Sequence, residues 1–313
     1  MKKVYYEFDT AVSYEVWVKN FALNLENIWK ETSAKILEKE EIKDKKAIII
    51  GRGPSLKKHN HLEKLYKSDF NGAIICTDGA LITTLNAGIT PEKFPNFYVV
   101  TVDPRTETIK FYNDEIVKKF GNKIKGIFST VSNPETVAKA RESGMKIFWF
   151  HSLVDYNEGK KSFNQISALM TRAKNHEKGL PAIQTGGNVG TSAWFLSWKI
   201  FNCSTVALIG INQGWDENDS WDTIMTHNGM CKKIEISKNS EAFEKLFPKI
   251  YNPDFDCYCI LDPIFQYYST GLKEFISRSP KWVRTINATE GGSVFGNRVE
   301  SMRFEEFLKI KYS

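Results

Sequence analysis

The sequence predicts an α/β fold of the Rossmann-like, doubly wound kind, with a mostly parallel sheet. From residue 46 onward, short uninterrupted apolar runs alternate with helical patterns. Such runs are typical of strands that are buried on both faces, as in a parallel sheet covered by helices. Several runs also end in glycine or a polar residue, and sheets of this kind bind ligands at the carboxyl ends of their strands.

The N-terminal residues 1–45 are expected to form a helical segment, because apolar residues recur at intervals of three and four from Val16 to Leu37. This segment fits either a helical cap or a contact in a homo-oligomer. Residues 46–212 are expected to form a Rossmann-like nucleotide-binding core. We expect strands at 47–50, 73–76, 97–102, 126–129, 146–150 and 206–211, and helices at 62–66, 80–87, 109–120, 134–142 and 193–201.

The segment 213–285 differs from the core in composition. It opens with an acidic, tryptophan-rich loop from Trp215 to Asp222, and an aromatic cluster around Tyr267 follows later. Aromatic residues beside carboxylates suit sugar binding, but aromatic residues also form cores and interfaces. We expect an insert or lid on the acceptor side of the site, after which residues 286–313 return to the core.

Composition narrows the class of protein. The 313 residues are 42% apolar and 13% aromatic, which is enough for one large domain or two small ones. The net charge of +6 is spread along the chain, which suits a small anionic ligand and argues against a nucleic-acid partner. No apolar stretch reaches the ~18 residues that a transmembrane segment needs. The five cysteines include no CxxC pair, so we expect a cytoplasmic protein with reduced thiols.

The run Gly51-Arg52-Gly53-Pro54-Ser55 follows the first apolar strand. Glycine lets a backbone approach a ligand closely, and free N–H groups at such a turn favour an anion. The run is neither a Walker loop nor a complete Gly-x-Gly-x-x-Gly motif. It therefore predicts a nucleotide phosphate site, with an ordinary strand-to-helix turn as the alternative.

Three further strand ends carry polar residues or glycine: Thr77-Asp78-Gly79, Asp103-Pro104-Arg105 and Gly210-Ile211-Asn212. Because carboxyl ends of parallel strands share one edge of the sheet, we expect these segments to converge on one cleft. Asp78 and Asp103 are candidates to hold a magnesium ion through substrate phosphates. Their alternative roles are to bind a ribose or to cap the following helices.

Small residues also precede a later apolar helix. Gly186, Gly187, Asn188 and Thr191 lie where that helix begins, and a helix N-terminus favours an anion or a nucleotide hydroxyl. The alternative is that the glycines only allow close packing of the helix on the sheet.

Two candidate residues for proton transfer lie in the C-terminal third. Glu290 stands beside Gly291 and Gly292, where it is expected to reach the cleft, although a helix C-cap turn would use the same residues. His227 lies in a polar loop of the insert, where a single histidine is more often structural than catalytic.

Several of these segments resemble a known family in the same order. Gly51-x-Gly53-Pro54-Ser55-Leu56, Asp78-Gly79-Ala80 and Val102-Asp103-Pro104 resemble the archaeal 6-hydroxymethylpterin diphosphokinase (MptE-like) family. Together with the segments 185–191 and 288–292, they also resemble the Maf (motility-associated factor) glycosyltransferases. Those proteins are similar to bacterial sialyltransferases that use a CMP-sugar. The resemblance covers residues 46–300 in patches.

The resemblance implies a transferase with a nucleotide donor. By analogy, donor phosphate would lie at Gly51, Gly53 and Ser55. The nucleotide pocket would be lined by Gly187, Asn188 and Thr191, and Asp78 and Asp103 would hold ribose or metal. Relatives often carry an aspartate where this chain has Asn212. An amide cannot act as a general base, so only a hydrogen-bonding role is expected there.

Three functions follow from this reading. The first is glycosyl transfer from a CMP-activated acidic sugar to a cell-surface or protein acceptor, with Glu290, His227 and Asp103 as candidate catalytic residues. The second is Mg-dependent pyrophosphoryl transfer from ATP to 6-hydroxymethyl-dihydropterin. The third is a nucleotide-binding protein without catalytic activity. The presence of Asn212 where relatives often have an aspartate is consistent with this alternative.

Overall fold

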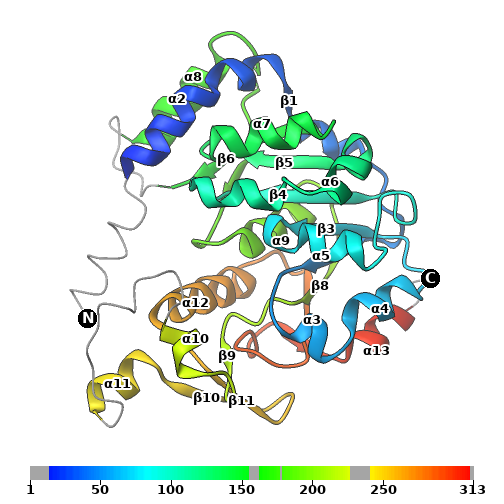
Figure 1. Cartoon of the computed structure of the whole chain (residues 1–313), viewed down its shortest axis with the longest axis vertical. Helices are drawn as coiled ribbons and strands as arrows, with labels where there is room; N and C mark the ends of the chain where they lie inside the picture. The colour runs from blue at the N-terminus through cyan, green and yellow to red at the C-terminus, as the bar shows by residue number, and fades with distance from the viewer. Residues whose placement is uncertain (1–13, 155–161, 177, 226–239, 311–313) are drawn as a thin grey trace.

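The computed structural model describes residues 14–154, 162–176, 178–225 and 240–310. A large parallel sheet runs through the molecule, helices cover both of its faces, and a small antiparallel sheet lies to one side (Figure 1). The α/β, Rossmann-like fold class predicted from the sequence is therefore confirmed.

In the described ranges, the large sheet has ten strands: β1 (Thr32–Ser33), β2 (Lys46–Ile50), β3 (Ala73–Thr77), β4 (Phe97–Thr101), β5 (Lys125–Ser129), β6 (Lys146–Leu153), β7 (Ala182–Gln184), β8 (Thr205–Ile209), β12 (Arg284–Asn287) and β13 (Val299–Ser301). Their order is β1-β6-β5-β4-β3-β2-β8-β12-β13, with β7 paired to β6, and neighbours run parallel. The strand order reverses between β2 and β8. Sheets of this kind bind their ligands at such a switch point.

The apolar strands supply two core clusters, one on each face of the sheet. Along β2, Ile48 and Ile50 belong to one cluster, whereas Ala47 and Ile49 belong to the other, because successive side chains of a strand point to opposite faces. The first face is covered by α2 (Tyr14–Lys30), α3 (Ser55–Lys58), α4 (His61–Tyr66), α5 (Leu81–Asn86), α6 (Glu115–Phe120), α7 (Pro134–Glu142) and α13 (Phe304–Lys309).

The second face is covered by α9 (Val189–Lys199), α12 (Pro263–Ser277) and the 3-10 helix η1 (Ala34–Lys39). The helix α8 (Phe163–Arg172) packs beside α2 through the rings of Phe163 and Phe21. Short 3-10 turns complete this part of the chain: η2 (Lys43–Lys45), η3 (Asp78–Ala80), η4 (Thr106–Phe111) and η5 (Gly121–Lys123).

A small antiparallel sheet occupies the middle of the segment 213–285. Its strands are β9 (Trp215–Asp216), β10 (Lys249–Asn252) and β11 (Cys257–Ile260), and they are accompanied by α10 (Trp221–Met225) and α11 (Glu241–Leu246). Ile224, Phe243, Phe247 and Ile260 form a separate small core. The helix α12 instead joins the large sheet, since Leu272 and Ile276 belong to its second core cluster.

Two sequence-based interpretations of local structure are wrong. The segment 109–120 is not one helix, because η4 ends at Phe111 and α6 begins at Glu115. The carboxylate of Asp114 accepts a hydrogen bond from the backbone N–H of Ile116 and so caps the second helix. The C-cap interpretation of the Glu290 segment is also wrong, because this segment follows strand β12.

In the part of the chain that the structure describes, no helix combines the length and the apolar character that crossing a bilayer requires.

Candidate functional site

The strand-end segments predicted from the sequence lie along neighbouring strands. The loops after β4, β3, β2 and β8 are adjacent because these four strands are consecutive in the sheet. At the switch point, the loop after β2 hydrogen-bonds to the end of β8: Gly51 N–H donates to Ile209 O at 2.9 Å, and Gly53 N–H donates to Gly210 O at 2.8 Å. The two loops thus form one continuous floor at the carboxyl edge.

Close packing of these loops requires glycine at positions 51 and 53. A Cβ atom at Gly51 would lie 2.4 Å from Gly210 O, and one at Gly53 would lie 2.1 Å from Asn212 Oδ1. Both approaches are far shorter than a van der Waals contact. The two glycines therefore serve the folded loop itself, and their N–H groups already have protein acceptors.

Asn212 connects three loops of the site. Its Oδ1 accepts a hydrogen bond from Ser55 Oγ at 2.9 Å, and its carbonyl oxygen accepts one from the backbone N–H of Ser293 at 2.9 Å. The loops after β2, β8 and β12 are thereby held together. Asn212 acts here as a hydrogen-bonding residue, in keeping with the role expected of an amide.

Asp78 is a buried carboxyl group at the end of β3. Only 5% of the residue is exposed, and its Oδ1 accepts a hydrogen bond from Gly79 N–H at 2.7 Å. Its Oδ2 is buried and has no hydrogen-bond partner among the described residues. Burial raises the pKa of Asp78 to about 7, and the nearby charge of Asp103 acts in the same direction. A buried oxygen without a partner is a site where a ligand hydroxyl could donate a hydrogen bond.

Asp103 forms an ion pair with Arg105 two residues later. The guanidinium donates to both carboxylate oxygens, with Nε 2.9 Å from Oδ1 and an amino nitrogen 2.6 Å from Oδ2. This pairing raises the pKa of Arg105. No group of three histidine, cysteine, aspartate or glutamate side chains within the described ranges could hold a metal ion. Magnesium at Asp78 and Asp103 stays a prediction.

The helix α9 begins at Val189, four residues before the start expected from the sequence, because Asn188 caps it there. Gly186 and Gly187 have left-handed backbones, with φ of 52° and 81°. The side chain of Asn188 caps the helix, since its Oδ1 accepts a hydrogen bond from the backbone N–H of Thr191 at 2.9 Å. Because α9 leads into the start of β8, its N-terminus lies at the carboxyl edge of the sheet.

A pocket of about 390 Å³ lies against the loop after β2. Its lining includes Arg52 and Pro54 from that loop, and Ala80 and Thr83 at the start of α5. The side chain of Arg52 runs along the loop after β3, where its Cδ would lie 2.9 Å from a Cβ atom on Gly79. The pocket thus borders the same two strand ends that carry Gly53 and Asp78.

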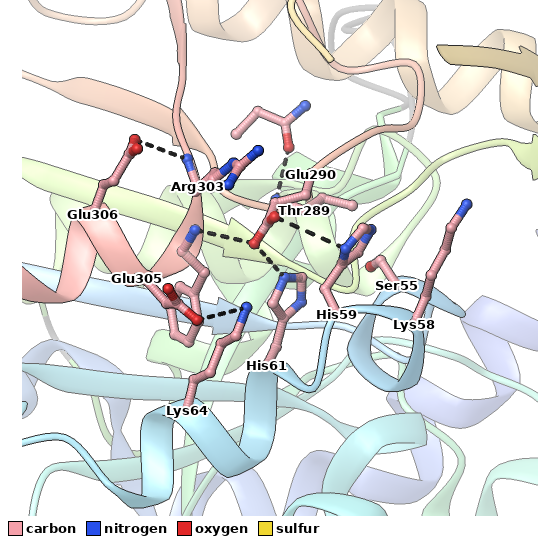
Figure 2. Close-up of polar contacts among 12 residues, drawn as sticks. Ser55, Lys58, His59, His61, Lys64, Thr289, Glu290, Arg303, Glu305 and Glu306 are labelled. Atoms are coloured by element: carbon pink, nitrogen blue, oxygen red, sulfur yellow. Dashed lines mark hydrogen bonds and ion pairs between the residues drawn. The ribbon is translucent and has the colours of Figure 1, made fainter. Parts of the chain in front are cut away.

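Glu290 lies between two histidines (Figure 2). Its Oε1 is 3.2 Å from His61 Nε2 and accepts a hydrogen bond from the backbone N–H of Phe304, while its Oε2 is 3.8 Å from His59 Nδ1. The exposed fraction of the side chain is 25% for His59, 12% for Glu290 and 0% for His61. Of these three side chains, His59 is the most accessible to a substrate.

The backbone of Glu290 is left-handed, with φ of 60°. This conformation is uncommon for a residue with a Cβ atom and persists only where the surroundings enforce it. The surroundings here include Asn287, whose Nδ2 donates to Gly291 O and Val294 O, and Asn252, whose Nδ2 donates to Gly292 O. The loop therefore directs the Glu290 carboxylate at the two histidines.

Burial favours the neutral form of both imidazoles. It lowers the pKa of His61 to about 4 and also lowers the pKa of His59, against the opposing attraction of Glu290. A neutral imidazole can accept a proton, and an adjacent carboxylate stabilises the cation that forms. His59 with Glu290 is therefore a candidate pair for proton transfer.

Comparison with known proteins places the chain in a family. The sequence model of the family described as "6-hydroxymethylpterin diphosphokinase MptE-like" matches residues 19–218. The chain belongs to the MptE-like family. The resemblance expected from the sequence is thus confirmed. No curated protein matches the MptE-like chain.

Among solved structures, the MptE-like chain is similar to the MAf glycosyltransferase from Magnetospirillum magneticum AMB-1. The TM-score is 0.56 at 13% sequence identity, and the match covers 90% of this chain and 39% of the other. This chain therefore spans about two fifths of the length of that protein. At this identity the likeness shows a shared fold.

The histidine pair beside Glu290 is the part of the site that the sequence did not predict. The available signal was the spacing of His59 and His61, which follow the predicted phosphate loop and are two of only five histidines in the chain. Their partner lies 229 residues beyond His61, so no local pattern joins them. His227, the histidine chosen from the sequence, lies outside the described residues.

Proposed function

We propose that this MptE-like chain is a nucleotide-dependent transferase that transfers a glycosyl group from a CMP-activated acidic sugar. The family description names a transferase activity, and the likeness to a MAf glycosyltransferase extends over 90% of the chain, well beyond the family match at residues 19–218. The observation that carries glycosyl transfer is the accessible His59 beside Glu290, because an acceptor hydroxyl must lose a proton as it attacks the sugar.

The nucleotide is proposed to bind across the carboxyl edge on either side of the switch point. An acidic residue at the end of the second strand of a Rossmann unit commonly binds a ribose hydroxyl, and the unpartnered Oδ2 of Asp78 is suited to that role. The N-terminus of α9 would face the phosphate, because its first N–H groups carry partial positive charge. Arg52 adds a cation near Asp78.

The proposed reaction is a single displacement. The acceptor oxygen forms a bond to the sugar carbon while the bond between that carbon and the phosphate oxygen breaks. The electron pair of the broken bond leaves with CMP, where preorganised donors stabilise the phosphate charge. The acceptor proton passes to the neutral imidazole of His59, and Glu290 stabilises the resulting cation.

Pyrophosphoryl transfer from ATP is the second candidate, because the family description names a diphosphokinase. The free Oδ2 of Asp78 is a suitable oxygen ligand for magnesium. Both oxygens of Asp103 already accept hydrogen bonds from Arg105, so Asp103 would have to exchange that partner for the ion. Because of this requirement, we propose the diphosphokinase only as the second candidate function.

The test is a thermal-shift and calorimetric titration of the full chain with CMP, CTP, ATP, GTP and UDP, each with and without magnesium. A ligand at 100 times its Kd stabilises a folded protein by about 2.7 kcal/mol, which is readily measured. Selective stabilisation by CMP, little changed by magnesium, would support the glycosyltransferase. A magnesium-dependent preference for ATP would support the diphosphokinase, and no response to any nucleotide would reject both.

Matched variants make this test specific to the site. Asp78→Asn should weaken the response to the nucleotide, whereas Asp69→Asn, at an exposed position of the same chain, should leave it unchanged. Binding of CMP without turnover of CMP-activated acidic sugars would indicate a nucleotide-binding protein that lacks the reaction.

A further inference from the structure

The N-terminal helix α2 buries two asparagines among its apolar residues. The buried residues of α2 are Asn20, Phe21, Asn24, Leu25 and Ile28. Asn20 is 4% exposed and Asn24 is 1% exposed. Burying an amide is unfavourable unless hydrogen bonds compensate it, so these two side chains need polar partners within the fold.

Both amides donate to backbone carbonyls at the carboxyl edge of the sheet. Asn20 Nδ2 donates to Pro104 O at 2.9 Å and to Val131 O at 3.1 Å. Asn24 Nδ2 donates to Thr130 O at 3.2 Å and to Ser132 O at 2.8 Å. These four carbonyls belong to the loops that follow β4 and β5. The helix α2 therefore fixes two strand-end loops through side-chain amides.

The two loops are also bonded to each other. The backbone N–H of Asn133 donates to Asp103 O at 3.2 Å, and Ser132 Oγ donates to Thr101 O at 3.0 Å. Asn20 contacts both loops, because Pro104 belongs to the first and Val131 to the second. The position of the Asp103–Arg105 ion pair therefore depends on α2.

The Asp103–Arg105 ion pair lies beside the proposed nucleotide site. The charge of Asp103 raises the pKa of the buried Asp78, and Arg105 is near Tyr268 of α12 on the opposite side of the edge. A shift of the loop after β4 would move Arg105 relative to Asp78. Misplacement of a charged group by about 1 Å can cost a large factor in binding or rate.

We propose that Asn20 and Asn24 are positioning residues, which hold the Asp103–Arg105 loop in the geometry that binds the nucleotide. This inference rests on the proposed function and extends it, because it makes α2 part of the site. It gives the N-terminal segment the role of a helical cap on the core, and a homo-oligomer contact through the same segment stays a prediction.

A double-mutant cycle with CMP as the probe tests the proposal. Asn20→Ala, Arg105→Ala and the double variant are compared for the Kd of CMP in protein that is folded by circular dichroism. If Asn20 acts through the loop, Asn20→Ala weakens CMP binding about tenfold, and the double variant is no weaker than Arg105→Ala alone. Additive effects of the two substitutions would overturn the proposal.

Asn27→Ala is the matched control, since Asn27 lies on the same helix and the four loop carbonyls are bonded by Asn20 and Asn24. It should leave the Kd of CMP unchanged. If Asn20→Ala does not fold, Asn24→Ala replaces it in the same cycle, because Asn24 holds the neighbouring carbonyls of Thr130 and Ser132.

Hydrogen exchange tests the positioning role of Asn20 independently of nucleotide binding. The amide of Asn133, which donates to Asp103 O, should exchange at least tenfold faster in Asn20→Ala than in wild type or Asn27→Ala, with no ligand present. Unchanged exchange would overturn the positioning role. If wild type binds no nucleotide while this exchange still rises, the proposed function fails and the loop contact itself stands.

Discussion

At the scale of single residues, the buried carboxyl of Asp78 opposes stability at neutral pH. Its pKa is raised to about 7, mainly by burial. An unfolded aspartate titrates near 4, so between these pH values the folded chain binds the extra proton. The contribution of Asp78 to stability is therefore complete at low pH and is lost as the pH rises through about 7.

Asp78→Asn should stabilise the protein at alkaline pH, because the amide has no charge to bury. We expect a gain on the order of 3 kcal/mol in the free energy of unfolding at pH 8, falling towards zero at pH 4. Urea unfolding at the two pH values measures it. An equal effect at both values would contradict the assignment of a raised pKa.

His61 should give a pH dependence of the opposite sign. Burial lowers its pKa to about 4, whereas an unfolded histidine titrates near 6.5. Between these values the unfolded chain binds the extra proton, so stability falls as the pH falls from 6.5 towards 4. The Tm of His61→Gln should therefore fall less than the Tm of wild type when the pH is lowered from 7 to 5.

The same residue scale shows how far the sequence could predict the site. Asp78, Asn188 and Asn212 are candidates from the sequence alone because each follows a recognisable strand or precedes a recognisable helix. His59 was missed because its importance depends on Glu290, which reaches it only after β12 has joined the sheet. Contacts across such a separation leave no periodic pattern in the sequence.

At the scale of elements, Asn188 sets the start of α9. Its Oδ1 accepts the backbone N–H of Thr191, and its Nδ2 donates to Gly186 O. Asn188→Ala should lower the free energy of unfolding by about 1 kcal/mol through loss of the cap. Asn188→Asp keeps the Oδ1 acceptor and is the matched control. Its free energy of unfolding should fall by less in the same urea experiment. Equal losses would show that the cap is not what stabilises the helix.

Elements with a strong local signal were predicted closely. The strand expected at 73–76 is Ala73–Thr77, and the helix expected at 134–142 is Pro134–Glu142, because uninterrupted apolar runs and an Asn-Pro start are unambiguous. Strand β12 is not predicted, since Arg284–Asn287 is short and Ile286 is its one apolar residue, which is neither an apolar run nor an alternating pattern. Its pairing with β8, a tertiary interaction, makes it a strand.

At the scale of the whole molecule, the buried apolar residues of the described ranges form three separate cores. Two lie on the faces of the large sheet, and the third lies under the small sheet. A small core buries less apolar surface and is expected to open more readily. The small sheet should therefore unfold locally before the large sheet does.

Among the residues that the structure describes, three buried cysteines can be used to test this order. Cys76 and Cys203 belong to the two large cores, and Cys259 lies in strand β11 of the small sheet. Burial raises the pKa of each thiol to about 12, so none should react with a maleimide in the closed protein. With increasing urea, peptide mapping should find Cys259 labelled first. Simultaneous labelling of all three would show a single cooperative unit instead.

The hydrogen bond between Ser55 and Asn212 spans 157 residues. A ribosome synthesises the chain from the N-terminus to the C-terminus, so strands β2 to β6 are made before β8. The loop after β2 consequently lacks its partner Asn212 until the chain has passed that residue, and the proposed nucleotide site is incomplete until then. If a nucleotide binds there as proposed, it stabilises the assembled protein and does not guide the early steps of folding.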